Sequence, residues 1–166
     1  RLQQRGQWLA VAESCTGGLI AAQITDISGA SAWFDRGVVT YSNRAKTELL
    51  GVPAALLDAH GAVSGQVASA MASGLRARAA VDWTVAVTGI AGPGGGTPDK
   101  PVGTVWIAWA GVGGTVEAEH CLFGGDRASV RQQTVTRALA GLLTDYDGQV
   151  TFDPGHSARS CLSYVP

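Results

Sequence analysis

The chain has 166 residues, of which 46% are apolar and 15% are charged, and its formal net charge is −1. This length is enough for one domain with its own core, and no basic patch indicates a nucleic-acid partner. No apolar stretch is long enough to span a membrane, and the first residues carry no signal-peptide pattern. We therefore expect a cytoplasmic protein without direct nucleic-acid or membrane contacts.

The cysteines and histidines give no sign of a metal site. Cys15, Cys121 and Cys161 are odd in number and far apart in the chain, which argues against a disulfide framework or a zinc site. The three histidines are also scattered, without ligand spacing. The sequence therefore predicts neither a metal nor a cofactor.

The first half of the chain alternates predicted strands and helices. Asn43 and Ser64 are predicted N-caps, because such side chains accept hydrogen bonds from the first helical turn. After Ser64, the apolar residues Val67, Met71 and Leu75 recur every four positions and mark one buried helix face. The elements predicted here are a buried strand over 8–12, a helix over 16–25, a strand over 36–41, a short helix over 44–50, a helix over 65–80 and a strand over 82–88.

The second half predicts two more strands and a last helix. Strands over 103–110 and 115–123 are joined by a glycine-rich turn at 111–114, which predicts an antiparallel hairpin. Asp126 is the predicted N-cap of a helix over 127–143. The alternation of strands and helices predicts an α/β fold, a three-layer α/β/α sandwich with a mixed sheet. We expect one domain over residues 1–144 and an irregular tail over 145–166.

The segment between the first strand and the first helix is the first candidate site. Ser14 lies where the strand ends, and Gly17 and Gly18 follow where the helix begins. This order presents a hydroxyl beside free backbone N–H groups of Thr16, Gly17 and Gly18. Hydrolases place a nucleophile next to an oxyanion site in this way. The alternative is a serine N-cap followed by glycines that allow close helix packing.

The two residues that flank Ser14 have open roles. Glu13 is either a buried hydrogen-bond acceptor that fixes the loop or a minor acid or base. Cys15 is a rival nucleophile, but no histidine lies in a context that supports this, and small buried cysteines are common.

Lys46 is the candidate general base. It lies near the start of the helix after Asn43, where a cation opposes the helix dipole, and Arg44 adds like charge. Both effects favour the neutral amine that a base needs. Tyr41 lies just before this helix, and its hydroxyl could relay a proton or orient the serine. The alternative is that Lys46 is a solvated surface lysine.

The glycine-rich loop over 89–103 is the candidate site for an anion. It follows the carboxyl end of a strand, where α/β sheets bind ligands, and its glycines let backbone N–H groups approach a phosphate. It is not a Walker loop, because no Gly-Lys-Ser/Thr follows, and the alternative is a flexible loop. The residues predicted to bind substrate here are Thr88, Gly94, Gly95, Gly96 and Thr97.

Arg127 opens the last predicted helix, where a cation is locally unfavourable. A bound anion shared with the helix N-terminus would offset this cost. Arg131 lies one turn later and could lie on the same side. The alternative is that both arginines are exposed and bind nothing.

The tryptophans predict self-association. The chain has five, and Trp106 and Trp109 alternate on one strand, so they lie on opposite faces of it. We expect at least one of these faces to be only partly covered, so that a second copy completes it in a homo-oligomer, a dimer. The alternative is that the tail over 145–166 folds back over that face.

The candidate motifs together resemble those of the CinA C-terminal domain family, which includes bacterial nicotinamide-nucleotide amidases. The similarity runs from about residue 8 to residue 143. The motifs that carry it are 13–18 (ESCTGG), 37–43 (GVVTYSN) followed by Lys46, 88–95 (TGIAGPGG) and 100–105 (KPVGTV).

The resemblance implies hydrolysis of the carboxamide of nicotinamide mononucleotide, which gives nicotinate mononucleotide and ammonia for pyridine nucleotide recycling. The family's serine, lysine and tyrosine fall on Ser14, Lys46 and Tyr41, and its substrate-binding arginine maps to Arg127. The tail over 145–166 does not resemble the family. The larger N-terminal domain of some members is absent, so we expect a stand-alone form or an excised domain.

The alternative function is a non-catalytic nucleotide-binding or regulatory module linked to competence or DNA damage. The position of two side chains distinguishes the functions. If the side chains of Ser14 and Lys46 pointed to different faces of the domain, the catalytic hypothesis would be wrong and the binding hypothesis would remain.

Overall fold

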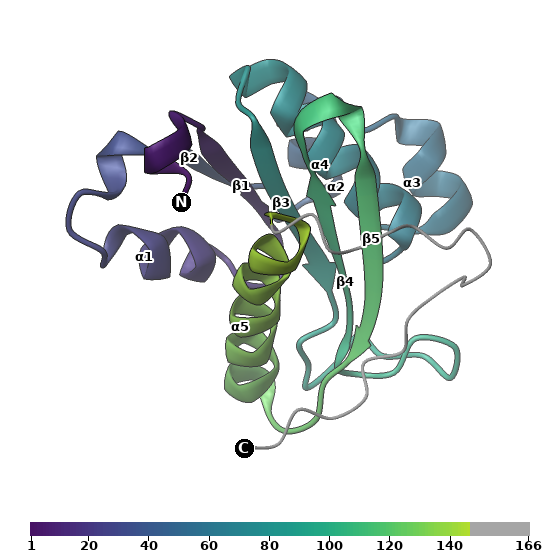
Figure 1. Ribbon diagram of the computed structural model, residues 1–166. Coiled ribbons are helices and arrows are strands. Elements are labelled where there is room, and N and C mark those ends of the chain that lie inside the picture. Colours follow the sequence, from purple (N-terminus) through teal and green to yellow (C-terminus); the bar gives the residue numbers. More distant parts are fainter. Residues whose placement is uncertain (147–166) are drawn as a thin grey trace.

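The computed structural model describes residues 1–146, and its centre is a five-stranded sheet with the order β2-β1-β3-β4-β5 (Figure 1). β2 and β3 both pair with β1 in parallel, whereas β4 pairs antiparallel with β3 and β5. The predicted mixed sheet and the β4–β5 hairpin are therefore confirmed. The strands are β1 (Leu9–Glu13), β2 (Phe34–Val39), β3 (Trp83–Gly89), β4 (Thr104–Ala110) and β5 (Val116–Leu122).

Helices cover both faces of this sheet, which confirms the predicted three-layer α/β/α fold. α1 and α5 lie on one face, and α2, α3 and α4 lie on the other (Figure 1). The helices are α1 (Leu19–Thr25), α2 (Asn43–Leu50), α3 (Ala54–His60), α4 (Gly65–Ala79) and α5 (Arg127–Tyr146), with short 3₁₀ turns η1 (Gln3–Arg5), η2 (Ala30–Ala32) and η3 (Val112–Gly114).

The size of the side chains differs between the two faces of the sheet. Along β3, Val85 and Val87 belong to the core beneath α1 and α5, whereas Ala86 belongs to the core beneath α4. β1 alternates in the same way, and so does β4 except at Trp106, which lies on the α4 side, because successive strand residues point to opposite faces. The small residues on this face of the sheet let the helix layer that contains α4 pack closely against it. At Gly74 of α4, an added Cβ would lie 1.9 Å from the carbonyl oxygen of Leu50.

Two predicted helix caps are confirmed. The Ser64 hydroxyl accepts a hydrogen bond from the backbone N–H of Val67 at 3.3 Å and caps α4. The Asp126 carboxylate accepts one from the N–H of Ser129 at 2.8 Å, at the start of α5. The first helical turn has unpaired N–H groups, and these side chains satisfy one of them in each helix.

Other predicted boundaries were wrong by a few residues. The N-cap of α2 is Ser42, whose hydroxyl accepts from the N–H of Ala45 at 3.0 Å, and Asn43 is already helical. α1 begins at Leu19 and not at residue 16, because Gly17 and Gly18 adopt left-handed conformations (φ 60° and 101°) that no α-helix contains. The second strand ends at residue 39, so residues 40 and 41 follow it.

Trp106 and Trp109 lie on opposite faces of β4, as predicted. Trp109 is buried beneath α5, and its indole N–H donates to the carbonyl of Ala138 at 2.9 Å. Trp106 is half-buried beside α4, with its ring 5.0 Å from that of His120. Neither ring leaves a whole face of the strand uncovered.

The last helix is longer than predicted and runs to Tyr146. Residues 145 and 146 of the expected irregular tail are therefore helical, and the rest of that prediction, over 147–166, lies outside the described residues. No helix among residues 1–146 is long and apolar enough to cross a membrane.

Candidate functional site

Ser14 directly follows the last residue of β1 and lies at the edge where parallel strands end. Its backbone N–H donates to the carbonyl of Val87 in β3 at 3.1 Å, which ties the turn to the neighbouring strand. The residue is 8% exposed. Because β1, β2 and β3 are parallel, the segments after all three strands gather at this edge.

Lys46 reaches this edge from α2. Its amine donates to the Ser14 hydroxyl at 3.1 Å and to the carbonyl oxygen of Thr40 at 2.8 Å. The residue is 1% exposed, so the alternative of a solvated surface lysine was wrong. The two side chains point to each other and not to different faces of the domain. A hydroxyl and an amine in this contact can act as a nucleophile and a base.

The electrostatics of Lys46 favour its neutral form. Burial lowers the pKa of the amine, because the protein interior solvates an ammonium poorly, while the neighbouring Cys15 opposes the shift. The sequence analysis predicted the direction of this pKa shift correctly, but it gave a different cause. Arg44 is exposed and pairs with Glu48 at 2.7 Å, so burial is the dominant cause and not the charge of Arg44.

Cys15 is poorly suited to act as the nucleophile. Burial raises the pKa of its thiol to about 11. A cysteine nucleophile reacts as the thiolate, which is scarce at neutral pH when the pKa is that high.

Glu13 is a fully buried acceptor at the base of the turn. Its position fits the first of its two predicted roles, that of an acceptor that fixes the loop. Its carboxylate accepts four hydrogen bonds, from the Thr16 hydroxyl at 2.6 Å and from the N–H groups of Gly18 at 2.9 Å, Ile20 at 3.1 Å and Ala21 at 2.9 Å.

The backbone N–H groups of the turn are not all available to a ligand. The N–H of Gly17 donates to the Ser14 carbonyl at 3.1 Å, and that of Gly18 is held by Glu13. Within the described part of the chain, the N–H groups of Cys15 and Thr16 donate to no oxygen atom. The expected row of free N–H groups over Thr16, Gly17 and Gly18 is therefore wrong for the two glycines, and the N–H groups of Cys15 and Thr16 face the Cys15 thiol, a weak acceptor.

Tyr41 and Arg127 meet at the surface beside the buried pair. Tyr41 is 62% exposed, and its hydroxyl accepts from Arg127 Nη2 at 3.2 Å. Arg127 Nη1 also donates to the carbonyl of Gly92 at 2.9 Å. No hydrogen bond in the described residues joins the Tyr41 hydroxyl to Ser14 or Lys46. Arg127 thus links the segment after β2 to the glycine-rich loop.

The glycine-rich loop is anchored at both ends and open in the middle. The Thr88 hydroxyl donates to the carbonyl of Ala62 at 2.8 Å, so it is occupied within the protein. The N–H of Thr97 donates to the carbonyl of Lys100 at 2.9 Å and closes the loop. The four predicted phosphate contacts, Gly94, Gly95, Gly96 and Thr97, are all exposed.

Two residues of the site were missed or underestimated from the sequence. Thr40 supplies the carbonyl that holds Lys46, and its only sequence signal was its place near the end of a predicted strand. Arg131 donates from Nη2 to the Thr16 carbonyl at 2.7 Å and braces the turn from α5, on the same side as Arg127. Backbone acceptors leave no residue-type signal, so no sequence pattern could have found either contact.

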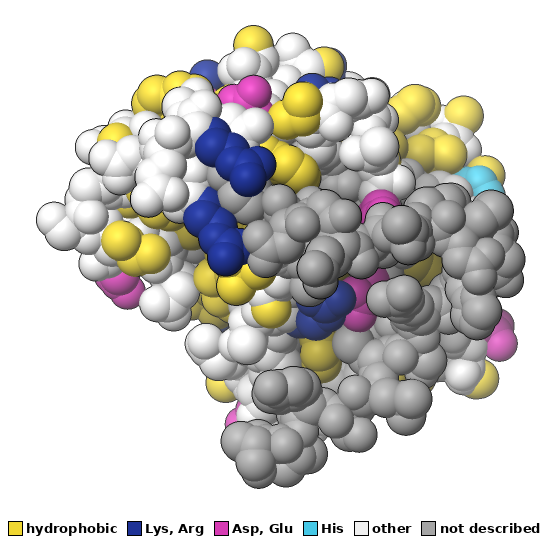
Figure 2. All heavy atoms as spheres, in the orientation of Figure 1, with side chains coloured by type: hydrophobic (Ala, Val, Ile, Leu, Met, Phe, Trp, Pro, Cys, Tyr) yellow, Lys and Arg dark blue, Asp and Glu magenta, His cyan; other side chains and the backbone are white. Residues whose placement is uncertain are grey.

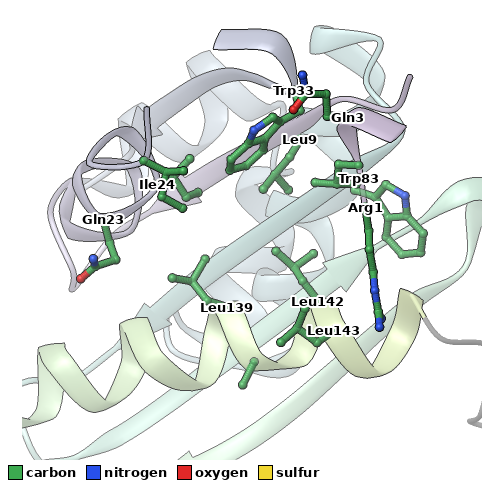
Figure 3. Close-up of a pocket in the computed structure, with 13 residues that line it drawn as sticks. Arg1, Gln3, Leu9, Gln23, Ile24, Trp33, Trp83, Leu139, Leu142 and Leu143 are labelled. Atoms are coloured by element: carbon green, nitrogen blue, oxygen red, sulfur yellow. The ribbon is translucent and has the colours of Figure 1, made fainter. Parts of the chain in front are cut away.

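A large apolar cavity of about 930 Å³ lies elsewhere, between α1 and the C-terminal half of α5 (Figure 3). Leu139, Leu142 and Leu143 of α5 line it opposite Ile24 and Trp33. The face that carries α1 and α5 also shows hydrophobic side chains beside Lys and Arg side chains (Figure 2). The cavity touches the first residue of β1, five residues before Ser14, or about 16 Å along a strand.

No group of three or more His, Cys, Asp or Glu side chains within residues 1–146 is arranged to hold a metal ion.

The chain is similar to known proteins in sequence and in structure. Residues 1–145 match the sequence profile described as the CinA C-terminal domain. The chain is 54% identical over 145 residues to a protein of Enterobacter agglomerans named nicotinamide-nucleotide amidohydrolase PncC, which covers 87% of this chain and 88% of that protein. It is 58% identical over 142 residues to a CinA-like protein of Akkermansia muciniphila, which covers 86% of this chain. The chain spans only 34% of that longer relative.

Solved structures show the same fold. The crystal structure of the competence damage-inducible protein A (ComA) from Klebsiella pneumoniae has a TM-score of 0.85 and 42% sequence identity, and the match covers 90% of this chain and 92% of that chain. The competence/damage inducible protein CihA from Agrobacterium tumefaciens has a TM-score of 0.84 and 46% identity, over 86% of this chain and 87% of that chain.

Lys46 should make the stability of the protein depend on pH. Its pKa is lowered in the folded state and returns to about 10.4 on unfolding, so the unfolded state binds more protons between these values. The free energy of unfolding therefore rises with pH across this range. Denaturant unfolding at several pH values should show a steeper rise for the wild type than for Lys46→Met, which keeps the chain length without the amine. If the free energies of unfolding of the wild type and Lys46→Met differed by the same amount at every pH, the pKa of Lys46 would not be lowered in the folded state.

Proposed function

The chain belongs to the CinA C-terminal domain family, and from this and the site we propose that it hydrolyses the carboxamide of nicotinamide mononucleotide to nicotinate mononucleotide and ammonia. The observation that carries the proposal is the 3.1 Å contact between the Lys46 amine and the Ser14 hydroxyl in a buried site. The similarity to the protein named PncC supports the choice of substrate. The proposal includes a cytoplasmic location and a role in pyridine nucleotide recycling.

In the first step, neutral Lys46 accepts the proton of the Ser14 hydroxyl. The Thr40 carbonyl holds one N–H of the amine at 2.8 Å, and in the proposed reactive state the 3.1 Å contact is reversed, so that the Ser14 hydroxyl donates to the nitrogen lone pair. Ser14 Oγ then attacks the carboxamide carbon, and the carbonyl oxygen gains a negative charge. The N–H groups of Cys15 and Thr16 are the available donors for this oxyanion.

In the second step, the Lys46 ammonium donates its proton to the leaving nitrogen. The C–N bond breaks, ammonia departs, and an ester between Ser14 and the substrate remains. A water molecule then attacks the ester and gives one proton to Lys46, which passes it to Ser14 Oγ as the ester bond breaks. The product acid loses its remaining proton to solvent and leaves as the carboxylate. Tyr41 is exposed and bonded to Arg127, so in this proposal it orients the substrate at the entrance and does not relay the proton.

The substrate phosphate is proposed to bind between Arg127 and the exposed stretch of the glycine-rich loop. Arg127 already contacts the loop through the Gly92 carbonyl, and a guanidinium can bind phosphate with two parallel hydrogen bonds. Exposed loop glycines can bring backbone N–H groups close to the same phosphate.

Replacement of either member of the buried pair should abolish turnover. Ser14→Ala removes the nucleophile, and Lys46→Ala removes the base, which contributes about 10²–10⁴-fold to rate. Ammonia release from nicotinamide mononucleotide measures both losses, with the exposed Ser73→Ala on α4 as a control that should keep wild-type activity.

Two outcomes would contradict this proposal. Full activity of Ser14→Ala would rule out the serine mechanism. Binding of pyridine nucleotides by the wild type without any turnover, over a range of pH, would favour the non-catalytic nucleotide-binding module.

Arg127→Ala should raise KM for nicotinamide mononucleotide. A charge-assisted hydrogen bond contributes about 1.5–3 kcal/mol, so the rise should be roughly tenfold to a hundredfold. Nicotinamide riboside lacks the phosphate, so its KM should change much less. Arg44→Ala, which removes an exposed arginine bonded to Glu48, is the matched control. Equal losses on both substrates would mean that Arg127 is structural.

We also propose that the protein forms a homodimer through the apolar cavity between α1 and α5. This cavity is not the surface on β4 that the tryptophan pattern predicted, because it lies beside Trp33 and Trp83 and no residue of β4 lines it. A second copy seated there would remove this surface from water.

Light scattering tests the dimer with a matched pair of variants. Leu143 lines the cavity and is 61% exposed, whereas Leu122 at the end of β5 is 58% exposed and lies outside it. Leu143→Glu should give a monomer, and Leu122→Glu should stay dimeric. A chain that ends at residue 144 distinguishes the alternative: if it dimerises while the full chain is monomeric, the tail covers the surface. A monomer in every case refutes self-association.

A further inference from the structure

The turn after β1 contains more backbone N–H groups than an oxyanion can use, and the structure separates them into two sets. Those of Gly18, Ile20 and Ala21 point to the Glu13 carboxylate, at 2.9, 3.1 and 2.9 Å. Those of Cys15 and Thr16 donate to no oxygen atom among the described residues and face the Cys15 thiol, a weak hydrogen-bond acceptor that a developing oxyanion can displace. The boundary between the sets lies between Thr16 and Gly18.

Glu13 is connected to both halves of the candidate site. Its side chain accepts the Thr16 hydroxyl at 2.6 Å, inside the turn that carries Ser14. Its backbone carbonyl accepts the N–H of Thr40 at 2.7 Å, and the carbonyl of Thr40 holds Lys46. One fully buried residue therefore sets the position of the nucleophile's turn and of the acceptor that orients the base.

We infer that Glu13 is a positioning residue, whose carboxylate directs three N–H groups away from the reacting carbonyl and leaves those of Cys15 and Thr16 to hold the oxyanion. This inference rests on the proposed function, because the oxyanion exists only if Ser14 attacks a carbonyl. It assigns Glu13 no proton transfer and no substrate contact.

The chemistry of the acceptor explains why a carboxylate is needed here. Three donors converge on Oε2 and one on Oε1, and both oxygens of a carboxylate accept hydrogen bonds. An amide side chain has one acceptor oxygen and one NH₂ group, so at least one of the four donors would face another donor. The carboxylate also satisfies two N–H groups of the first turn of α1, those of Ile20 and Ala21.

Glu13→Gln tests the inference with two measurements. The first is steady-state hydrolysis of nicotinamide mononucleotide, for which kcat should fall on the order of 10²-fold while KM stays within about threefold, because displaced donors impair the transition state only. The second is amide hydrogen exchange, in which the N–H groups of Ile20 and Ala21 should exchange faster than in the wild type.

Two further variants give a control and a milder change. Thr84→Val removes another buried hydrogen bond, from Thr84 to the Ala72 carbonyl at 2.9 Å, at the opposite end of β3. It should lower stability and leave kcat unchanged. Thr16→Val keeps the carboxylate but removes one donor, so it should lower kcat less than Glu13→Gln, and it remains informative if Glu13→Gln fails to fold.

The outcomes separate this inference from the proposed function. If the wild type does not hydrolyse the nucleotide, the proposed function fails, and unchanged exchange of Ile20 and Ala21 in Glu13→Gln would overturn the positioning role independently. If the wild type is active, a Glu13→Gln protein with wild-type kcat overturns the inference and leaves the Ser14 mechanism intact. A rise in KM with unchanged kcat would also overturn it.

Discussion

The site depends on one buried amine. Lys46 is removed from water, and among residues 1–146 its amine has hydrogen bonds to two polar groups, the Ser14 hydroxyl and the Thr40 carbonyl. A charged ammonium in this place would lack most of its solvation, so the pKa of Lys46 is lowered. The same burial therefore favours the neutral amine and holds it against the Ser14 hydroxyl, which is the contact on which the proposed function rests.

The order of the strands creates the edge at which these groups meet. β1 lies between β2 and β3, and all three run in the same direction. The turn after β1 carries Ser14, the segment after β2 carries Thr40 and Tyr41, and the loop after β3 carries the glycines. α5 returns across this edge and adds Arg127, which bonds to both of the outer segments. An antiparallel neighbour on either side of β1 would have moved one of these segments to the far end of the sheet.

The apolar cavity shows that the size of a hollow does not identify the site. It lies about 16 Å from Ser14 along β1, at the other end of the strand. Its lining is mainly leucine, isoleucine and tryptophan, and it lacks the convergent polar groups that orient a substrate. Burial of an apolar partner surface suits this chemistry better than catalysis of amide hydrolysis.

The sequence alone determined the five strands, four of the five helices of the described chain, the caps at Ser64 and Asp126, and the place of Ser14 after a buried strand, because these depend on neighbouring residues, but it missed α3. It also singled out Lys46, although for a cause that proved secondary. Only the tertiary structure decided which groups touch. The contact of Lys46 with Ser14 spans 32 positions, and that of Arg127 with Tyr41 spans 86. Such contacts arise from the packing of whole helices against the sheet, and burial follows from the same packing, so no local pattern contains them.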